Sequence, residues 1–329
     1  MPKVFQNIGM ILLCVIIIAI PRFNRNQIWL KRPQADMAIH TAMVDHFRTG
    51  EVKEILLSKD SIAANWRPLF PFIASWLPFS PITSLSILGI LSIFFSAILL
   101  KKIMSKLKIT EQNNWRSIYL FIISFPTFYY TTIGYVDPGL IFFIILSIYL
   151  LVLEKELLFL PLLGLGVLMK EGIIVLIPFY IFYLLSKNKS KWNVFLKFGI
   201  ICFIYLTVSF FVRKIALNAT EDHAVFWQPS TDMLAYNFKR PNSWLSLFLT
   251  LGIPGIIILK NILELKRLIR IHSIVLPLIS GIILSLITYS FAFISTVADG
   301  RTVWAAYPFM IPLVGLLLDN QRHGLSNDA

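Results

Sequence analysis

Apolar stretches close to 20 residues long recur along the whole chain, and this feature restricts the possible fold more than any other. A helix of about 20 apolar residues spans the hydrocarbon core of a bilayer and satisfies its own backbone polar groups there. The chain is 57% hydrophobic and only 14% charged, with a mean hydropathy of +0.75. The sequence therefore predicts an all-α polytopic membrane protein, with residues 1–329 forming a single integral membrane domain.

The apolar runs predict ten membrane-spanning helices. Their expected bounds are 4–20, 81–100, 117–136, 138–153, 157–169, 172–186, 195–212, 244–259, 273–294 and 303–318. Residues 69–79 are also apolar, but this segment is too short to cross a bilayer and contains Pro71 and Pro78. We expect it to form a re-entrant or interfacial helix.

An even number of spans places both termini on one side of the membrane. The short connections 101–116 and 187–197 are rich in Lys and Arg, and short basic loops face the cytoplasm. Both termini are therefore expected in the cytoplasm. The first loop, residues 21–80 with its short helices, and a second loop, residues 213–243, are expected on the extracytoplasmic side.

The formal net charge of +13 does not indicate a nucleic-acid-binding protein. The Lys and Arg residues gather between apolar segments, where they orient helices, and no basic stripe is interleaved with aromatic residues. Cys14 and Cys202 both lie inside apolar segments, so we predict packing residues and no disulfide framework.

A polar stretch, residues 21–67, carries the strongest functional signal, because long connections between membrane helices are uncommon unless they have a role. Asp36 and His40 are four residues apart, so a helix there places both on one face. A partly buried acid at the membrane boundary, oriented by a neighbouring group, suits a general base. The alternative is a solvated helix N-terminus, where Asp36 only complements the helix dipole. Asp45 is expected to point to another side of that helix.

Lys170 and Glu171 lie side by side between two short predicted spans. A charge at membrane depth costs about 2.5–3.5 kcal/mol, so both side chains are expected to face a cavity rather than lipid. The alternative is a structural pair in which the two residues neutralise each other. Arg67 precedes the apolar segment 69–79, and its alternative role is that of an anchor at the membrane interface.

Asp137 and Arg301 occupy turns at the extracytoplasmic ends of predicted spans. Pro138 fits the first position of a helix, so Asp137 is either the N-cap of that helix or a functional acid. Arg301 is suited to bidentate contact with phosphate, or it anchors a surface turn. The consecutive residues Glu221-Asp222-His223 resemble a ligand cluster, but neighbours in sequence rarely all point at one metal. We therefore predict no cofactor, and a divalent metal has no support in the sequence.

Several short motifs follow one another along the chain in a recognisable order. They are Ala35-Asp36-Met37-Ala38-Ile39-His40, Trp66-Arg67-Pro68-Leu69-Phe70-Pro71, Gly134-Tyr135-Val136-Asp137, Met169-Lys170-Glu171-Gly172, and Asp299-Gly300-Arg301 with Tyr307-Pro308. Together they resemble the GT-C superfamily of polyprenyl-phosphate-sugar-dependent glycosyltransferases, in particular its mannosyltransferase-like bacterial members. Two features depart from that pattern: Asp36 is followed by Met37 rather than by a second acid, and no C-terminal soluble domain is recognised.

The resemblance implies an inverting hexosyltransferase in the cell envelope, in the bacterial inner (plasma) membrane. Its donor would be a polyprenyl-phosphate-linked sugar, and its acceptor a hydroxyl of a glycan, lipid or protein. Asp36 would be the general base, with His40 beside it, and basic side chains would hold the leaving phosphate. The residues expected to bind substrate are Arg67, Asp137, Lys170, Glu171 and Arg301.

Three other functions stay open at this point. Charges within spans also suit a transporter or lipid flippase, but transporters usually show inverted repeats, and the sequence contains no internal repeat. A lipid-linked oligosaccharide polymerase or ligase would use similar chemistry on a different fold. A non-catalytic membrane subunit would tolerate substitution of Asp36.

Overall fold

The computed structural model describes residues 3–29, 35–58, 65, 67–187, 189–216 and 228–327. All regular secondary structure in these ranges is helical, as the sequence predicts. Five segments within them are long and apolar enough to cross a membrane. They are α6 (Pro81–Lys106), α12 (Lys191–Ile215), α14 (Pro241–Lys260), α16 (Val275–Ser295) and Gly300–Gln321, which joins η4 (Gly300–Ala306) to α17 (Tyr307–Asn327). By length and composition, these helices indicate an integral membrane protein.

Shorter apolar segments lie in other helices of the same bundle. These helices are α1 (Lys3–Trp29), α9 (Asp137–Val152), α10 (Glu156–Met169) and α11 (Leu176–Ser186), which follows the 3-10 helix η2 (Glu171–Val175). The total of ten spans stays a prediction, because these segments are shorter than a full bilayer crossing.

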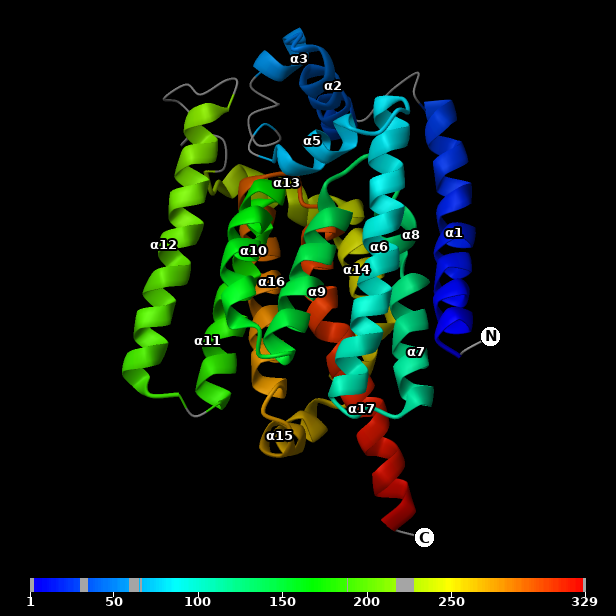
Figure 1. Cartoon of the computed structure of the whole chain (residues 1–329), viewed down its shortest axis with the longest axis vertical. Coiled ribbons are helices and arrows are strands. Elements are labelled where there is room, and N and C mark those ends of the chain that lie inside the picture. Colours follow the sequence, from blue (N-terminus) through cyan, green and yellow to red (C-terminus); the bar gives the residue numbers. More distant parts are fainter. Residues whose placement is uncertain are drawn as a thin grey trace.

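The two ends of the bundle differ in what covers them. In Figure 1, α2 (Ala35–Thr49), α3 (Glu54–Leu57) and α5 (Leu69–Ser75) lie over one end, and α15 (Ile262–Ile271) lies at the other. We call these the α2 end and the α15 end. In Figure 1, the N-terminal end of α1 and the C-terminal end of α17 both point away from the α2 end. The side of the membrane on which the termini lie stays a prediction. The helix α13 (Thr231–Lys239) lies toward the α2 end.

The core of the bundle lies where α6 packs along α9. Ile93, Ala97 and Leu100 of α6 are fully buried there, together with the isoleucines of α9. Gly89 allows an even closer approach, because a Cβ at this position would lie 2.1 Å from the carbonyl oxygen of Thr131. The turn after Thr131, which leads into α9, is therefore held directly against α6.

The prediction of one continuous helix over residues 117–136 was wrong, and whether this broken segment crosses the membrane stays a prediction. Residues Glu111–Ile122 form α7, Phe125–Tyr130 form the short helix α8, and a turn leads on to α9. Pro126 explains the break. Proline lacks a backbone N–H, so it is accommodated in the first turn of a helix rather than in its interior, and α8 starts afresh after the extended residue Ser124.

The first helix is longer than predicted, since α1 continues from the expected end at residue 20 to Trp29. Pro21 lies inside it, and the helix continues past this residue. Beyond the apolar part, the guanidinium of Arg22 is buried and lies 4.2 Å from the centre of the Tyr129 ring. This cation–π contact stabilises the added turns against α8.

The apolar segment 69–79 forms the expected short helix, α5, and Arg48 fixes α2 onto it. Arg48 Nε donates to the carbonyl of Ser75 at 3.2 Å, and its Nη2 donates to the carbonyl of Leu77 at 2.7 Å. Carbonyls at a helix C-terminus have no partner within the helix, so one guanidinium here satisfies several of them. Whether α5 lies in the membrane or at its interface stays a prediction.

Candidate active site

Arg301 of η4 joins two acids that are far apart in the sequence. Its Nη1 donates to Asp36 Oδ2 at 2.7 Å, and its Nε lies 3.9 Å from Asp137 Oδ2. Its Cζ lies 4.3 Å from the centre of the Tyr135 ring, a cation–π contact on the face of the guanidinium. Asp36 is in the first turn of α2, so its ion pair with Arg301 ties α2 to η4.

Lys170 and Glu171 bind different partners, so the alternative in which the two residues neutralise each other was wrong. Lys170 Nζ donates to Asp137 Oδ1 at 2.5 Å. Glu171 accepts two hydrogen bonds from Arg67, one of them from Nε at 2.9 Å. The backbone explains the separation. Lys170 is extended (φ −171°, ψ 139°) between α10 and η2, and extended backbone turns consecutive side chains to opposite sides.

Asp137 does not cap α9, which corrects the structural alternative for this residue. The N-cap position belongs to Val136, and Asp137 is the first residue of the helix. Its carboxylate instead lies between Lys170 and Arg301. A buried carboxylate needs charged or hydrogen-bonding partners, and the two cations supply them.

Three cations and three anions thus form one charge cluster under α2. Its members are Asp36, Arg67, Asp137, Lys170, Glu171 and Arg301. Asp137, Arg67 and Lys170 form its buried side, with side chains 4%, 8% and 9% exposed. Asp36 and Glu171 are 36% and 38% exposed and form its open edge. Among the six members of the cluster, these two carboxylates are therefore the most accessible to a ligand.

Asp36 is ionised in the resting structure. Burial by itself would raise the pKa of its carboxyl, but the opposing effect of Arg301, with smaller contributions from His40 and Arg67, lowers that pKa well below its usual range. A carboxylate with so low a pKa is a weak base.

His40 is neutral and buried directly below Asp36 on the same face of α2. Burial, with the nearby guanidinium groups of Arg67 and Arg301, lowers its pKa to about 4, against a smaller opposing effect of the carboxylates. Its Nδ1 lies 3.2 Å from the carbonyl oxygen of Gly134, which can only accept, so Nδ1 carries the proton. Nε2 is then an acceptor, and it has no partner among the described residues. The ring therefore binds the turn before α9 rather than Asp36.

Two features that hold Arg301 in place were not expected from the sequence. Asn237 of α13 is fully buried and bonds the chain just before η4, donating to the carbonyl of Thr296 at 2.6 Å and accepting from the backbone N–H of Ala298 at 2.9 Å. Tyr130 donates its hydroxyl proton to Asp299 Oδ1 at 2.5 Å. Isolated polar residues such as these carry no spacing signal that would connect them to Arg301.

Gly300 is required because no side chain fits between η4 and α14 at this position. A Cβ on it would lie 2.2 Å from the carbonyl oxygen of Ser246 and 2.5 Å from Thr250 Oγ1. Its own backbone N–H donates to Ser246 Oγ at 3.0 Å. The absence of a side chain therefore lets η4 pack directly on α14, which sets the position of Arg301.

All seven residues that the sequence singled out for the site lie in or beside this cluster. Asp45 faces away from it and pairs with Lys53 at 2.5 Å, as the helical spacing indicates. Trp66 and residues 221–223 lie outside the described residues. Among the residues that the structure does describe, no group of three or more His, Cys, Asp or Glu side chains is arranged to hold a metal ion. No protein-family model, curated protein or solved structure matches the chain.

Proposed function

We propose that the protein is a glycosyltransferase that moves a sugar from a polyprenyl-phosphate-linked donor to an acceptor hydroxyl. The observation that carries this proposal is the Asp36–Arg301 ion pair at the open edge of the charge cluster. It pairs a carboxylate that can accept a proton with a guanidinium that can bind phosphate, as the order of motifs along the chain also implies. These two groups are what the transfer requires, a base for the acceptor and a cation for the leaving group.

The donor phosphate would bind by replacing the carboxylate of Asp36 on Arg301. Arginine presents a planar fork of donors that matches phosphate, and Lys170 and Arg67 are further cations of the same cluster. Loss of its ion pair would let the pKa of Asp36 rise, because Arg301 is the main cause that lowers it. Donor binding would in this way switch Asp36 from a paired anion to a general base.

In the transfer step, Asp36 would take the proton of the acceptor hydroxyl while that oxygen attacks the anomeric carbon of the sugar. The bond from the anomeric carbon to the phosphate oxygen breaks, and polyprenyl phosphate leaves as an anion held by Arg301. A single displacement inverts the anomeric configuration. It needs no general acid, because a phosphate leaves without being protonated, in contrast to the alkoxide released in glycoside hydrolysis.

The same proposal places the α2 end outside a bacterial inner (plasma) membrane, with ten spans and both termini in the cytoplasm. The basic connections 101–116 and 187–197 support this orientation. Single cysteines at Lys53 and Lys239 should react with an impermeant thiol reagent in intact cells, and one at Lys189 should not. The opposite labelling pattern would contradict the proposed orientation and with it the extracytoplasmic location of the site.

A transfer assay tests the function itself. The full-length protein is placed in liposomes with a set of polyprenyl-phosphate sugars that carry a radiolabel, together with membrane extract as the source of acceptor. We expect the label to move from the lipid fraction to a product with the inverted linkage. Asp36→Asn should be at least a hundredfold slower than wild type, since loss of a positioned base costs about 10²–10⁴ in rate. Asp45→Asn, on the same helix but away from the cluster, should transfer near normally.

A transporter or flippase is the second candidate, and the shape of α14 favours it. Gly252 adopts a positive φ of 49° and interrupts the helix, and Pro254 follows it. Interrupted helices occur in many transporters. The same liposomes separate the two functions. Movement of an intact lipid-linked sugar across the bilayer, with no new glycosidic bond, would establish transport and contradict the glycosyltransferase.

A further inference from the structure

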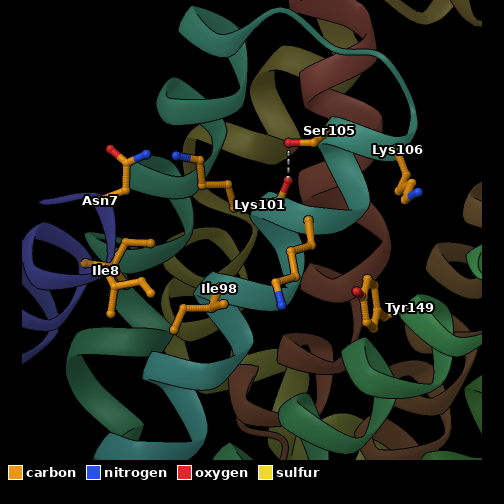
Figure 2. A pocket seen from close by; sticks show the side chains of 9 residues that line it. Asn7, Ile8, Ile98, Lys101, Ser105, Lys106 and Tyr149 are labelled. Atoms are coloured by element: carbon orange, nitrogen blue, oxygen red, sulfur yellow. Dashed lines mark hydrogen bonds between the residues drawn. The ribbon is translucent and has the colours of Figure 1, made fainter. Parts of the chain in front are cut away.

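A cavity of about 460 Å³ lies far from the charge cluster, beside the last turns of α6. Its walls come from the first turns of α1, the last turns of α6 and the last turns of α9. The lining residues are Asn7, Ile8, Ile11, Ile98, Lys101, Lys102, Ser105, Lys106 and Tyr149. Figure 2 shows Ile8 and Ile98 facing each other in one part of this cavity, with Lys106 and Tyr149 on the other side of α6.

The cavity has an apolar part and a cationic part. Ile8, Ile11 and Ile98 form the apolar part. In the cationic part, the Lys101 amine is already engaged, since it lies 3.0 Å from Glu111 Oε1 and 3.9 Å from the centre of the Trp115 ring. Lys102 and Lys106 are exposed, and no carboxylate of a described residue pairs with either.

We propose that this cavity binds an anionic phospholipid, with the phosphate on Lys102 and Lys106 and one acyl chain against Ile8 and Ile98. Basic pockets between membrane helices bind anionic headgroups, and each Lys near a membrane surface contributes about 1 kcal/mol. The apolar part distinguishes a lipid from a soluble phosphate, because only the lipid fills both parts. The site lies near the termini, the end that the basic loops assign to the cytoplasm, and anionic lipids are enriched in that leaflet.

The binding is measured on the purified full-length protein by native mass spectrometry and by thermal unfolding, with phosphatidylglycerol or phosphatidylcholine added to the detergent. Wild type should retain phosphatidylglycerol in preference to phosphatidylcholine and unfold at a higher temperature with it. Lys102→Gln with Lys106→Gln should weaken the binding of phosphatidylglycerol about thirtyfold, which corresponds to about 2 kcal/mol. Ile98→Trp, which fills the apolar part, should also weaken it.

A matched control removes the same charge elsewhere at this end of the bundle. Lys189→Gln with Lys191→Gln changes one exposed lysine in the connection between α11 and α12 and one at the first position of α12, and it should leave the affinity unchanged. An equal loss of affinity for phosphatidylglycerol in both double variants would show that general surface charge causes the effect, and this would overturn the proposal. So would equal binding of the two lipids. Stabilisation by glycerol 3-phosphate at the same concentration, unchanged by Ile98→Trp, would show a site for a soluble phosphate instead.

Discussion

Arg301 Nη1 lies 2.7 Å from Asp36 Oδ2, although 265 residues separate the two in the sequence. Each of these residues therefore determines the chemistry of the other. Arg301 lowers the pKa of the Asp36 carboxyl, and Asp36 occupies the position on the guanidinium that a phosphate would take. For this reason, substitutions of the two residues should have opposite effects on donor binding.

Arg301→Gln should weaken donor binding about 10-fold to 100-fold, because a charge-assisted hydrogen bond contributes about 1.5–3 kcal/mol. Asp36→Asn keeps the guanidinium and removes the carboxylate that competes for it, so this variant should bind the donor at least as well as wild type. Binding of a non-transferable polyprenyl-phosphate analogue measures both. If Asp36→Asn binds it as weakly as Arg301→Gln, the two residues stabilise the fold together and Arg301 does not hold phosphate.

Lys170→Met should destabilise the folded protein by about 3–5 kcal/mol, because it leaves the carboxylate of Asp137 buried next to one cation fewer. Adding Asp137→Asn to this variant should restore much of the loss, since the uncompensated charge is gone. Thermal unfolding in detergent measures both variants. Lys187→Met, which breaks the exposed pair with Glu154, should cause no measurable change. Additive effects of Lys170→Met and Asp137→Asn would contradict the pairing.

Asn237→Ala should lower stability by about 1–3 kcal/mol and also slow transfer. It leaves the carbonyl of Thr296 and the N–H of Ala298 without their partner and frees the chain just before Arg301. Asn261→Ala, in a half-buried position at the α15 end, should cost about 0.5–1.5 kcal/mol through its own lost hydrogen bonds and leave transfer unchanged. Normal transfer by a destabilised Asn237→Ala would show that this anchor does not position Arg301.

Gly300→Ala and Gly199→Ala should have opposite effects on stability. At Gly300 the added methyl group meets the carbonyl of Ser246 at 2.2 Å, so η4 must move away from α14. At Gly199, inside α12, nothing lies within 4 Å, and replacing a helical glycine by alanine stabilises by about 0.5–1 kcal/mol. Unfolding temperatures in one detergent compare the two. An unaffected Gly300→Ala protein would contradict the close packing of η4 on α14.

His40→Gln should make stability less dependent on pH between about 6.5 and 4. The pKa of His40 is lowered to about 4 in the folded state, so the unfolded chain binds a proton more readily in this range and stability falls as the pH falls. The contribution is complete above pH 6.5 and changes by at most about 1.4 kcal/mol per pH unit. His46→Gln, a partly exposed histidine on the same helix, is the matched control, and stability is measured by thermal unfolding across this range. An unchanged slope in His40→Gln would show that His40 is not the group involved.

The length and composition of the apolar runs alone predicted most of the helices, because a chain in a bilayer must satisfy its backbone within each segment. The break between α7 and α8 was missed, although Pro126 marked it, since a proline within an apolar run is also compatible with a continuous kinked helix. The extension of α1 to Trp29 was missed because hydropathy reports where a helix leaves the apolar layer rather than where the helix ends.

For the site, the sequence by itself determined which residue types were candidates, because charges next to apolar spans are costly and stand out in a membrane protein. The sequence could not determine which charged side chains form ion pairs with each other. Lys170 and Glu171 are adjacent in the chain, yet the extended backbone at Lys170 directs one to Asp137 and the other to Arg67. The pairing of Asp36 with Arg301 depends on α2 folding back over the bundle and on Asn237 and Gly300 holding η4 beneath it. Only tertiary packing decides such contacts, because they join segments whose separation in the sequence carries no spacing signal.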